Sequence, residues 1–119
     1  MIIPDHSPTG ALKGTPIRLM TAQTVDESVS TVICPGQGIQ NHTFTVTVSD
    51  PATTGILQLE SSVDPLYTGV WASLFAIIDL ATIDGQLEVS ISNRMIVACR
   101  ARVSTVVAGG NVTVDYIGQ

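Results

Sequence analysis

The chain has 119 residues, of which 45% are hydrophobic but only 4% aromatic, and its formal net charge is −5. This length fits one domain whose core is built from aliphatic side chains. Five Lys and Arg residues in total are too few for a phosphate-binding patch, so we expect neither nucleic acid nor an anionic membrane as a partner.

Residues 1–23 differ from the rest because they contain three prolines and two glycines, which disfavour regular structure. We predict an extended N-terminal arm here, with Ile17–Met20 as a short first strand. The arm is either a poorly ordered terminus or a segment that orders on a partner. Because the N-terminus lacks a basic region followed by an apolar run, we expect no secretory signal and synthesis in a cytoplasm.

Residues 24–119 are predicted to form the β domain. Val25–Cys34 is rich in β-branched residues and indicates a strand. His42–Ser49 alternates apolar residues with Thr and Ser and is the clearest strand in the chain. A turn rich in Pro and Gly separates it from Gly55–Ser62, so we predict that these two strands form a hairpin.

Trp71–Leu80 follows a loop over residues 63–70 and is apolar on both faces. That pattern favours a central strand buried on both sides, with a short helix as the alternative. Gln86–Ser92 alternates again. Arg94–Ile117 is predicted to be a hairpin around the turn Gly109-Gly110-Asn111. The residues of its first strand that we expect to face inward are Met95, Val97, Cys99, Ala101 and Val103.

These segments amount to about seven or eight strands, with turn signals every eight to twelve residues. The sequence therefore predicts an all-β fold, an antiparallel β-sandwich of jelly-roll-like type with an extended N-terminal arm.

Catalytic and metal-binding patterns are missing from the sequence. His6 and His42 have no partner at a ligand spacing, and we expect His42 at the edge of the core. No Gly-x-Ser-x-Gly motif occurs, and the carboxylates are scattered. We therefore expect no enzyme, no cofactor and no metal. Cys34 and Cys99 are expected to be free thiols, with a disulfide between them as the alternative.

Two groups of residues are candidates for contacts. Arg100 and Arg102 lie on one strand face, which is either an ordinary solvated face or a contact to an acidic partner, with Asp115 as a plausible mate. Tyr67 and Trp71 are either core residues or a platform on which a sugar ring stacks.

Four short motifs follow one another along the chain: Glu-x-Ser-x-Asp at 60–64, Trp-x-x-Leu at 71–74, Arg-x-Arg-Val at 100–103 and Gly-x-Val-Thr-Val at 110–114. Over residues 56–118 this order resembles small β-sandwich virion proteins of tailed bacteriophages. The chain departs from that pattern at Val63 and in the inserted loop over residues 65–70. The family pattern contains no catalytic residues.

The resemblance implies a capsid decoration (cement) protein of the virion, made in the host cytoplasm. Such a protein would bind the major capsid protein of the assembled shell as a homotrimer. The residues expected to contact the capsid or a neighbouring subunit are Ile2, Ile3, Lys13, Ile17, Arg18, Arg100 and Arg102. The alternatives are a tail, baseplate or head-fibre subunit, or a host-glycan-binding β-sandwich module that uses Tyr67 and Trp71.

Overall fold

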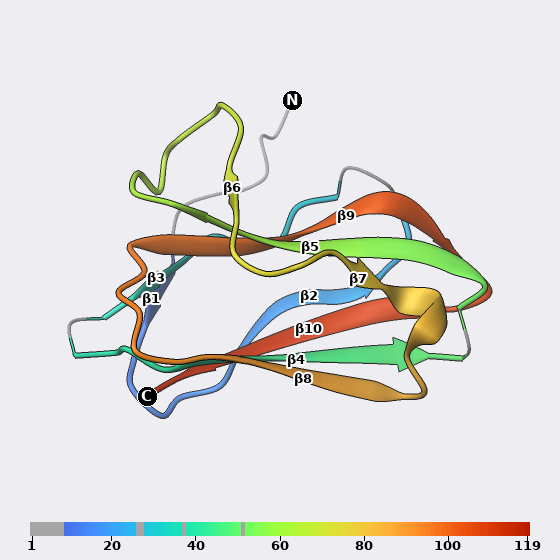
Figure 1. The fold of residues 1–119 in the computed structure, drawn as a ribbon, viewed down its shortest axis with the longest axis horizontal. Coiled ribbons are helices and arrows are strands. Elements are labelled where there is room, and N and C mark those ends of the chain that lie inside the picture. Colours follow the sequence, from blue (N-terminus) through green and yellow to red (C-terminus); the bar gives the residue numbers. More distant parts are fainter. Residues whose placement is uncertain (1–8, 26–27, 37, 51) are drawn as a thin grey trace.

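The computed structural model describes residues 9–25, 28–36, 38–50 and 52–119 of the chain. Its strands form two sheets that lie face to face (Figure 1). The predicted all-β sandwich is therefore confirmed. Aliphatic side chains from the two inner faces meet between the sheets, as in other sandwiches.

The first sheet has four strands in the order β2-β10-β4-β8, and every neighbouring pair is antiparallel. Its strands are β2 (Ile17–Gln23), β10 (Asn111–Gly118), β4 (His42–Ser49) and β8 (Gln86–Ile91).

The second sheet has six strands in the order β1-β3-β9-β5, with two short strands, β6 and β7, that both pair with β5. Among the described strand pairs, only that of β1 with β3 is parallel. Its strands are β1 (Thr9–Ala11), β3 (Ile33–Pro35), β9 (Ala98–Ala108), β5 (Thr54–Ser62), β6 (Ala72–Ser73) and β7 (Ile78–Asp79).

The jelly-roll order is also present. When β6 and β7 are counted as one interrupted edge strand, the eight strands from β2 to β10 alternate between the two sheets along the chain, except that β5 and the β6–β7 strand after it lie in the same sheet. Closely stacked sheets joined in this way are the jelly-roll arrangement. β1 adds a ninth, short strand beside β3.

Both predicted hairpins are wrong. β4 pairs with β10 and β8 in one sheet, whereas β5 pairs with β9 in the other, so the turn after Ser49 crosses between the sheets. The turn after Ala108 crosses in the same way from β9 to β10. These two crossings lie side by side, because Gly110 packs against the backbone carbonyls of Ser49 and Asp50.

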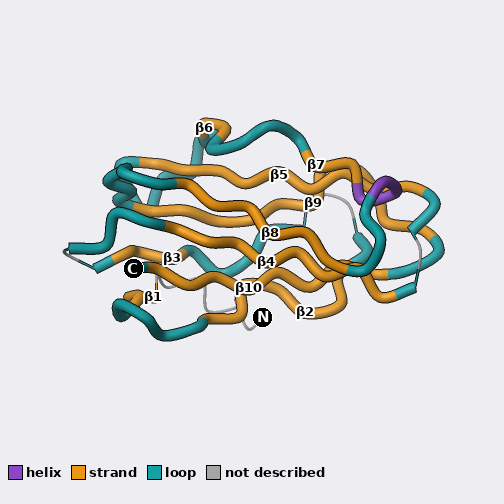
Figure 2. Tube along the Cα trace, turned by 60° about the horizontal axis from the view of Figure 1, so that its bottom comes forward, coloured by secondary structure: helices purple, strands orange, loops and turns teal. Residues whose placement is uncertain are grey.

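Two other predicted strands are much shorter than expected. Within Val25–Cys34 the described residues form only the start of β3 and a single bridge between Val29 and Arg102. Trp71–Leu80 is not a central strand. It contains β6, β7 and the start of a 3-10 turn, η1 (Leu80–Thr82), and it lies at the edge of the six-stranded sheet (Figure 2). Its residue Ile77 is 61% exposed.

The N-terminal segment enters the sandwich earlier than predicted. The expected strand at Ile17–Met20 is confirmed and continues to Gln23 as β2. Thr9–Ala11 forms β1 beside β3. The described part of the segment is thus paired with both sheets. Ile2 and Ile3 lie outside the described residues.

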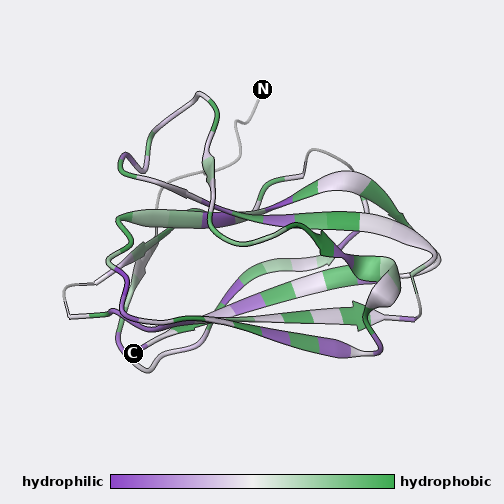
Figure 3. Ribbon diagram, in the orientation of Figure 1, coloured by the Kyte–Doolittle hydropathy of each residue, from purple (hydrophilic) through white to green (hydrophobic). Residues whose placement is uncertain are grey.

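The core follows the predicted alternation of apolar residues. Figure 3 shows this alternation as bands along the strands. On β4, Phe44 and Val46 are fully buried, and on β5 the same holds for Leu57 and Leu59. Each of these side chains contributes about 1.5–3 kcal/mol through burial. A smaller second cluster consists of Val32, Trp71 and Ala98, with Cys34 packed against it.

Candidate functional site

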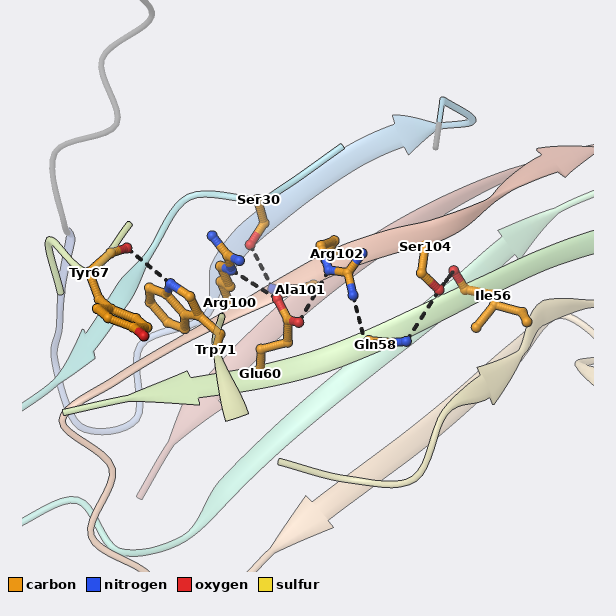
Figure 4. A network of polar contacts seen from close by, with 10 residues as sticks. All are labelled: Ser30, Ile56, Gln58, Glu60, Tyr67, Trp71, Arg100, Ala101, Arg102 and Ser104. Carbon is orange, nitrogen blue, oxygen red and sulfur yellow. Dashed lines mark hydrogen bonds and ion pairs between the residues drawn. The ribbon is translucent and has the colours of Figure 1, made fainter. Parts of the chain in front are cut away.

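Polar side chains are concentrated on the outward face of β5 and β9. Glu60 on β5 lies opposite Arg100 on β9 in the sheet register and is only 4% exposed. Its Oε1 accepts a hydrogen bond from Arg100 Nε at 3.0 Å, and its Oε2 accepts one from Arg102 Nε at 3.2 Å (Figure 4). One buried carboxylate therefore neutralises part of the charge of two guanidinium groups.

The network continues along both strands. Arg102 Nη2 donates to Gln58 Oε1 at 2.9 Å, and Gln58 Nε2 donates to Ser104 Oγ at 3.4 Å. Ser30 joins from the neighbouring segment, because its Oγ accepts the backbone N–H of Ala101 at 2.9 Å.

Trp71 connects this network to the loop over residues 63–70. The Arg100 guanidinium carbon lies 4.3 Å from the centre of the Trp71 ring, a cation–π contact. Trp71 Nε1 donates to the backbone carbonyl of Tyr67 at 3.1 Å. Glu60, Arg100 and Trp71 thus fasten the loop to the sheet.

Asp115, which the sequence analysis offered as a mate of Arg100 and Arg102, pairs elsewhere. Its carboxylate lies 2.9 Å from Arg18 Nε, and that pair is on the four-stranded sheet. Asp115 was assigned to Arg100 and Arg102 because β9 and β10 were predicted to pair in one hairpin. The actual partner of both arginines is Glu60 on β5.

The predicted contact residues that the structure describes are divided between the two sheets. Lys13 is exposed in the turn between β1 and β2, Ile17 is half-buried against the core, and Arg18 is exposed. Ile17 and Arg18 belong to β2 of the four-stranded sheet, whereas Arg100 and Arg102 lie on β9 of the other sheet.

Tyr67 and Trp71 differ in exposure. Trp71 is 5% exposed and belongs to the second apolar cluster, whereas Tyr67 is 45% exposed. Since Arg100 lies over the Trp71 ring, that ring acts as a packing element in this structure. A sugar could stack on it only after Arg100 had moved.

An apolar groove of about 380 Å³ lies between the loop over residues 63–70 and the segment over residues 94–97. Its most exposed apolar side chains are Val63 at 87%, Val70 at 91%, Met95 at 72% and Val97 at 50%. We call these four side chains and the groove between them the loop surface. Met95 and Val97 were expected to face inward, which is wrong, because β9 begins only at Ala98.

His42 is a core residue, 1% exposed. Its Nε2 lies 2.8 Å from the Arg94 carbonyl, which can only accept, so Nε2 carries the proton. Nδ1 then accepts the hydrogen bond from the Tyr116 hydroxyl at 2.7 Å. Burial lowers the pKa of His42. Both ring nitrogens are engaged inside the protein, which fits a structural role.

The two cysteines are free, as expected. Cys99 is buried opposite Ile33, while Cys34 is half-buried and packs with the second apolar cluster. Burial, with a smaller effect of Cys34, raises the pKa of the Cys99 thiol to about 12. Among residues 9–119, as far as the structure describes them, no three His, Cys, Asp or Glu side chains are arranged to hold a metal ion.

No protein-family model, no curated protein and no solved structure matches this chain. In the described part of the chain, no helix has the length and apolar character needed to cross a bilayer.

Proposed function

We propose that this protein is a structural subunit of a tailed-phage particle, specifically a decoration protein that binds the major capsid protein of the assembled shell. The observation that carries the proposal is the loop surface, where Val63, Val70, Met95 and Val97 are half or more exposed. Apolar side chains grouped around a groove are typical of protein–protein contacts. The motif order in residues 56–118 points to the same class of protein.

The loop surface is presented on a rigid support. The Glu60–Arg100 pair, the stacking of Arg100 on Trp71 and the hydrogen bond from Trp71 to Tyr67 hold the loop on the sheet. A loop that is ordered before binding loses less conformational entropy on association. This favours a surface that binds without rearrangement.

The activity in this proposal is adhesion. A subunit that binds the assembled shell and not its separated parts stabilises the shell by mass action. Association of three copies would multiply weak contacts into a strong attachment. In our proposal the loop surface is the contact between copies in a homotrimer.

The test is co-sedimentation of the full chain with shells assembled from the major capsid protein encoded beside its gene. The wild type should sediment with the shells. Val70→Lys should lose at least tenfold in occupancy, because a charge at this 91% exposed position breaks the contact between copies and with it the combined attachment of three copies. Val25→Lys is the control, since Val25 is 60% exposed but belongs to the opposite end of the sandwich. Absence of wild-type binding, or equal loss in both variants, would overturn the proposal.

The alternative is a tail, baseplate or head-fibre subunit. In that case the chain would be found in purified virions but would not bind shells. A glycan-binding module has less support, because the Trp71 ring that it would use is buried beneath Arg100.

A further inference from the structure

The outer edge of β8 is regular, and none of the residues that the structure describes pairs with it. β8 is the terminal strand of the four-stranded sheet and contacts β4 on one side only. The backbone N–H of Val48 donates to the carbonyl of Gly85 at 2.8 Å, so these two opposed residues form a hydrogen-bonded pair. Every second pair along β4 and β8 is then also hydrogen-bonded. Continuing the antiparallel register, Leu87, Val89 and Ile91 direct their backbone groups to β4. The backbone N–H and C=O groups of Glu88 and Ser90 therefore face the open side.

The other sheet edges are protected in the ways that stable proteins use. β1 has three residues, and β6 and β7 have two each. β2 is interrupted by two register shifts and by Ala22 at φ +48°, and its Leu19 carbonyl accepts the N–H of Thr31 at 3.4 Å. Of the described edges, β8 alone combines six residues with an uninterrupted register.

A groove of about 320 Å³ with apolar and polar lining lies beside the start of this edge, between Gln86 and Leu87 of β8 and the segment that contains β7 and η1. Its apolar lining includes Phe75 at 44%, Ile77 at 61% and Leu87 at 37% exposure. A strand added to β8 would direct every second side chain toward the space between the sheets. The groove can therefore receive the alternate apolar side chains of such a strand.

The rim of the groove is acidic. Asp79 and Asp84 line it, Glu88 lies on the adjoining outward face of β8, and no Lys or Arg is among the described lining residues. A second copy joined through β8 would bring these carboxylates together and repel itself. The charge pattern instead fits a partner with cationic side chains between its apolar ones.

We propose that β8 is a docking edge for an extended polypeptide segment in which apolar residues alternate with Lys or Arg. The segment pairs with the backbone of Glu88 and Ser90, its apolar side chains enter the groove, and its cations face the acidic rim. This is strand addition, in which backbone hydrogen bonds supply affinity and alternate side chains supply specificity.

The probe is an acetylated, amidated heptapeptide of alternating Lys and Ile, compared with a block peptide of the same composition and with an alternating Glu and Ile peptide. Titrations are followed by amide chemical shifts of the full-length protein. We expect only the alternating Lys peptide to bind, with an affinity that falls as salt is raised. Equal binding of the alternating and block peptides would show charge attraction alone and would overturn the proposal.

Two variants at one position separate the edge from its charge. Glu88→Pro removes an N–H that faces the open side and spares the ladder to β4, so binding should fall at least tenfold. Glu88→Ala keeps that N–H and should lose only a fewfold. Unchanged binding by a folded Glu88→Pro protein would contradict strand addition.

Hydrogen exchange on the wild type gives a readout that does not depend on the variants. The amides of Glu88 and Ser90 should exchange rapidly in the free protein and become at least tenfold slower when the alternating Lys peptide is bound. Amides that are already protected, or that are unaffected by a saturating peptide, would overturn the proposal even if the proline variant does not fold.

Discussion

The Tyr116 hydroxyl lies 2.7 Å from Nδ1 of His42, inside the core of the sandwich. Tyr116 is 1% exposed, and so is His42. The hydroxyl donates because the other ring nitrogen already donates to the Arg94 carbonyl. The pair therefore holds the end of β10 against β4 and against the chain before β9, with a neutral imidazole between them.

This pair predicts how stability depends on pH. Burial places the pKa of His42 in the folded protein below its ordinary value, so the unfolded chain binds the proton more readily. The contribution of His42 to the free energy of unfolding should be complete above the ordinary pKa, about 6.5. This contribution should be lost as the pH is lowered through and below that value. Urea denaturation between pH 7.5 and 5 measures the slope. His42→Gln should be less stable at pH 7.5 but should show a flatter profile, and a variant as steep as the wild type would contradict the assignment.

Removal of the negative charge of Glu60 should lower the stability of the protein strongly. Glu60→Gln leaves Arg100 and Arg102, whose side chains are 18% and 20% exposed, without their shared carboxylate. We expect a loss of about 3 kcal/mol in the free energy of unfolding. Chemical denaturation at neutral pH is the measurement.

Asp115→Asn is the matched control for Glu60→Gln. The Arg18–Asp115 pair is exposed to solvent, with side chains at 59% and 32%. Such a pair contributes little and is screened by salt. Asp115→Asn should lower the free energy of unfolding far less than Glu60→Gln does. Equal losses in the two variants would show that the buried Glu60 pairing stabilises the protein no more than the exposed one.

Gly110 lies where the two crossings between the sheets meet, and there is no room for a side chain at this position. A Cβ at this position would clash with the backbone carbonyls of Ser49 and Asp50, which cannot move without disturbing the turn after β4. Gly110→Ala should therefore cost about 1–3 kcal/mol. The control is Gly10→Ala in β1, where an added Cβ meets nothing within 4 Å. A fall in melting temperature for the control as large as that for Gly110→Ala would contradict the packing described.

These crossings also show what the sequence could and could not predict. Alternation in His42–Ser49 and Gly55–Ser62 correctly identified the apolar side chains that face the core. A hairpin within one sheet and a crossing between two sheets bury the same alternate residues, however. The pattern therefore predicted the core and the sandwich, while the pairing of β4 with β10 and of β5 with β9 depended on contacts far apart in the chain.

The network around Glu60 was missed for a related reason. On an alternating strand a Glu beside buried leucines is expected to face solvent, and so are Arg100 and Arg102. Whether they are covered depends on Trp71 and its loop, which pack over this face from elsewhere in the chain. Likewise, Met95 and Val97 continue the alternation of β9 beyond the point where the strand itself begins.

The cysteines predict a difference in reactivity. Burial raises the pKa of Cys99 to about 12 and also raises that of the half-buried Cys34. At pH 8 both thiols are largely protonated and should react slowly with Ellman's reagent in the native protein, Cys99 the more slowly of the two. Two thiols should react promptly in denaturant. Native Cys99 reacting as quickly as a free thiol would contradict its burial.

The oligomeric state tests the central claim, that the loop surface makes the protein an assembling subunit. Light scattering after size exclusion should give a trimer for the wild type and for Val25→Lys at micromolar concentration. Val70→Lys should give a folded monomer. A wild-type protein that stays monomeric at that concentration would contradict the account.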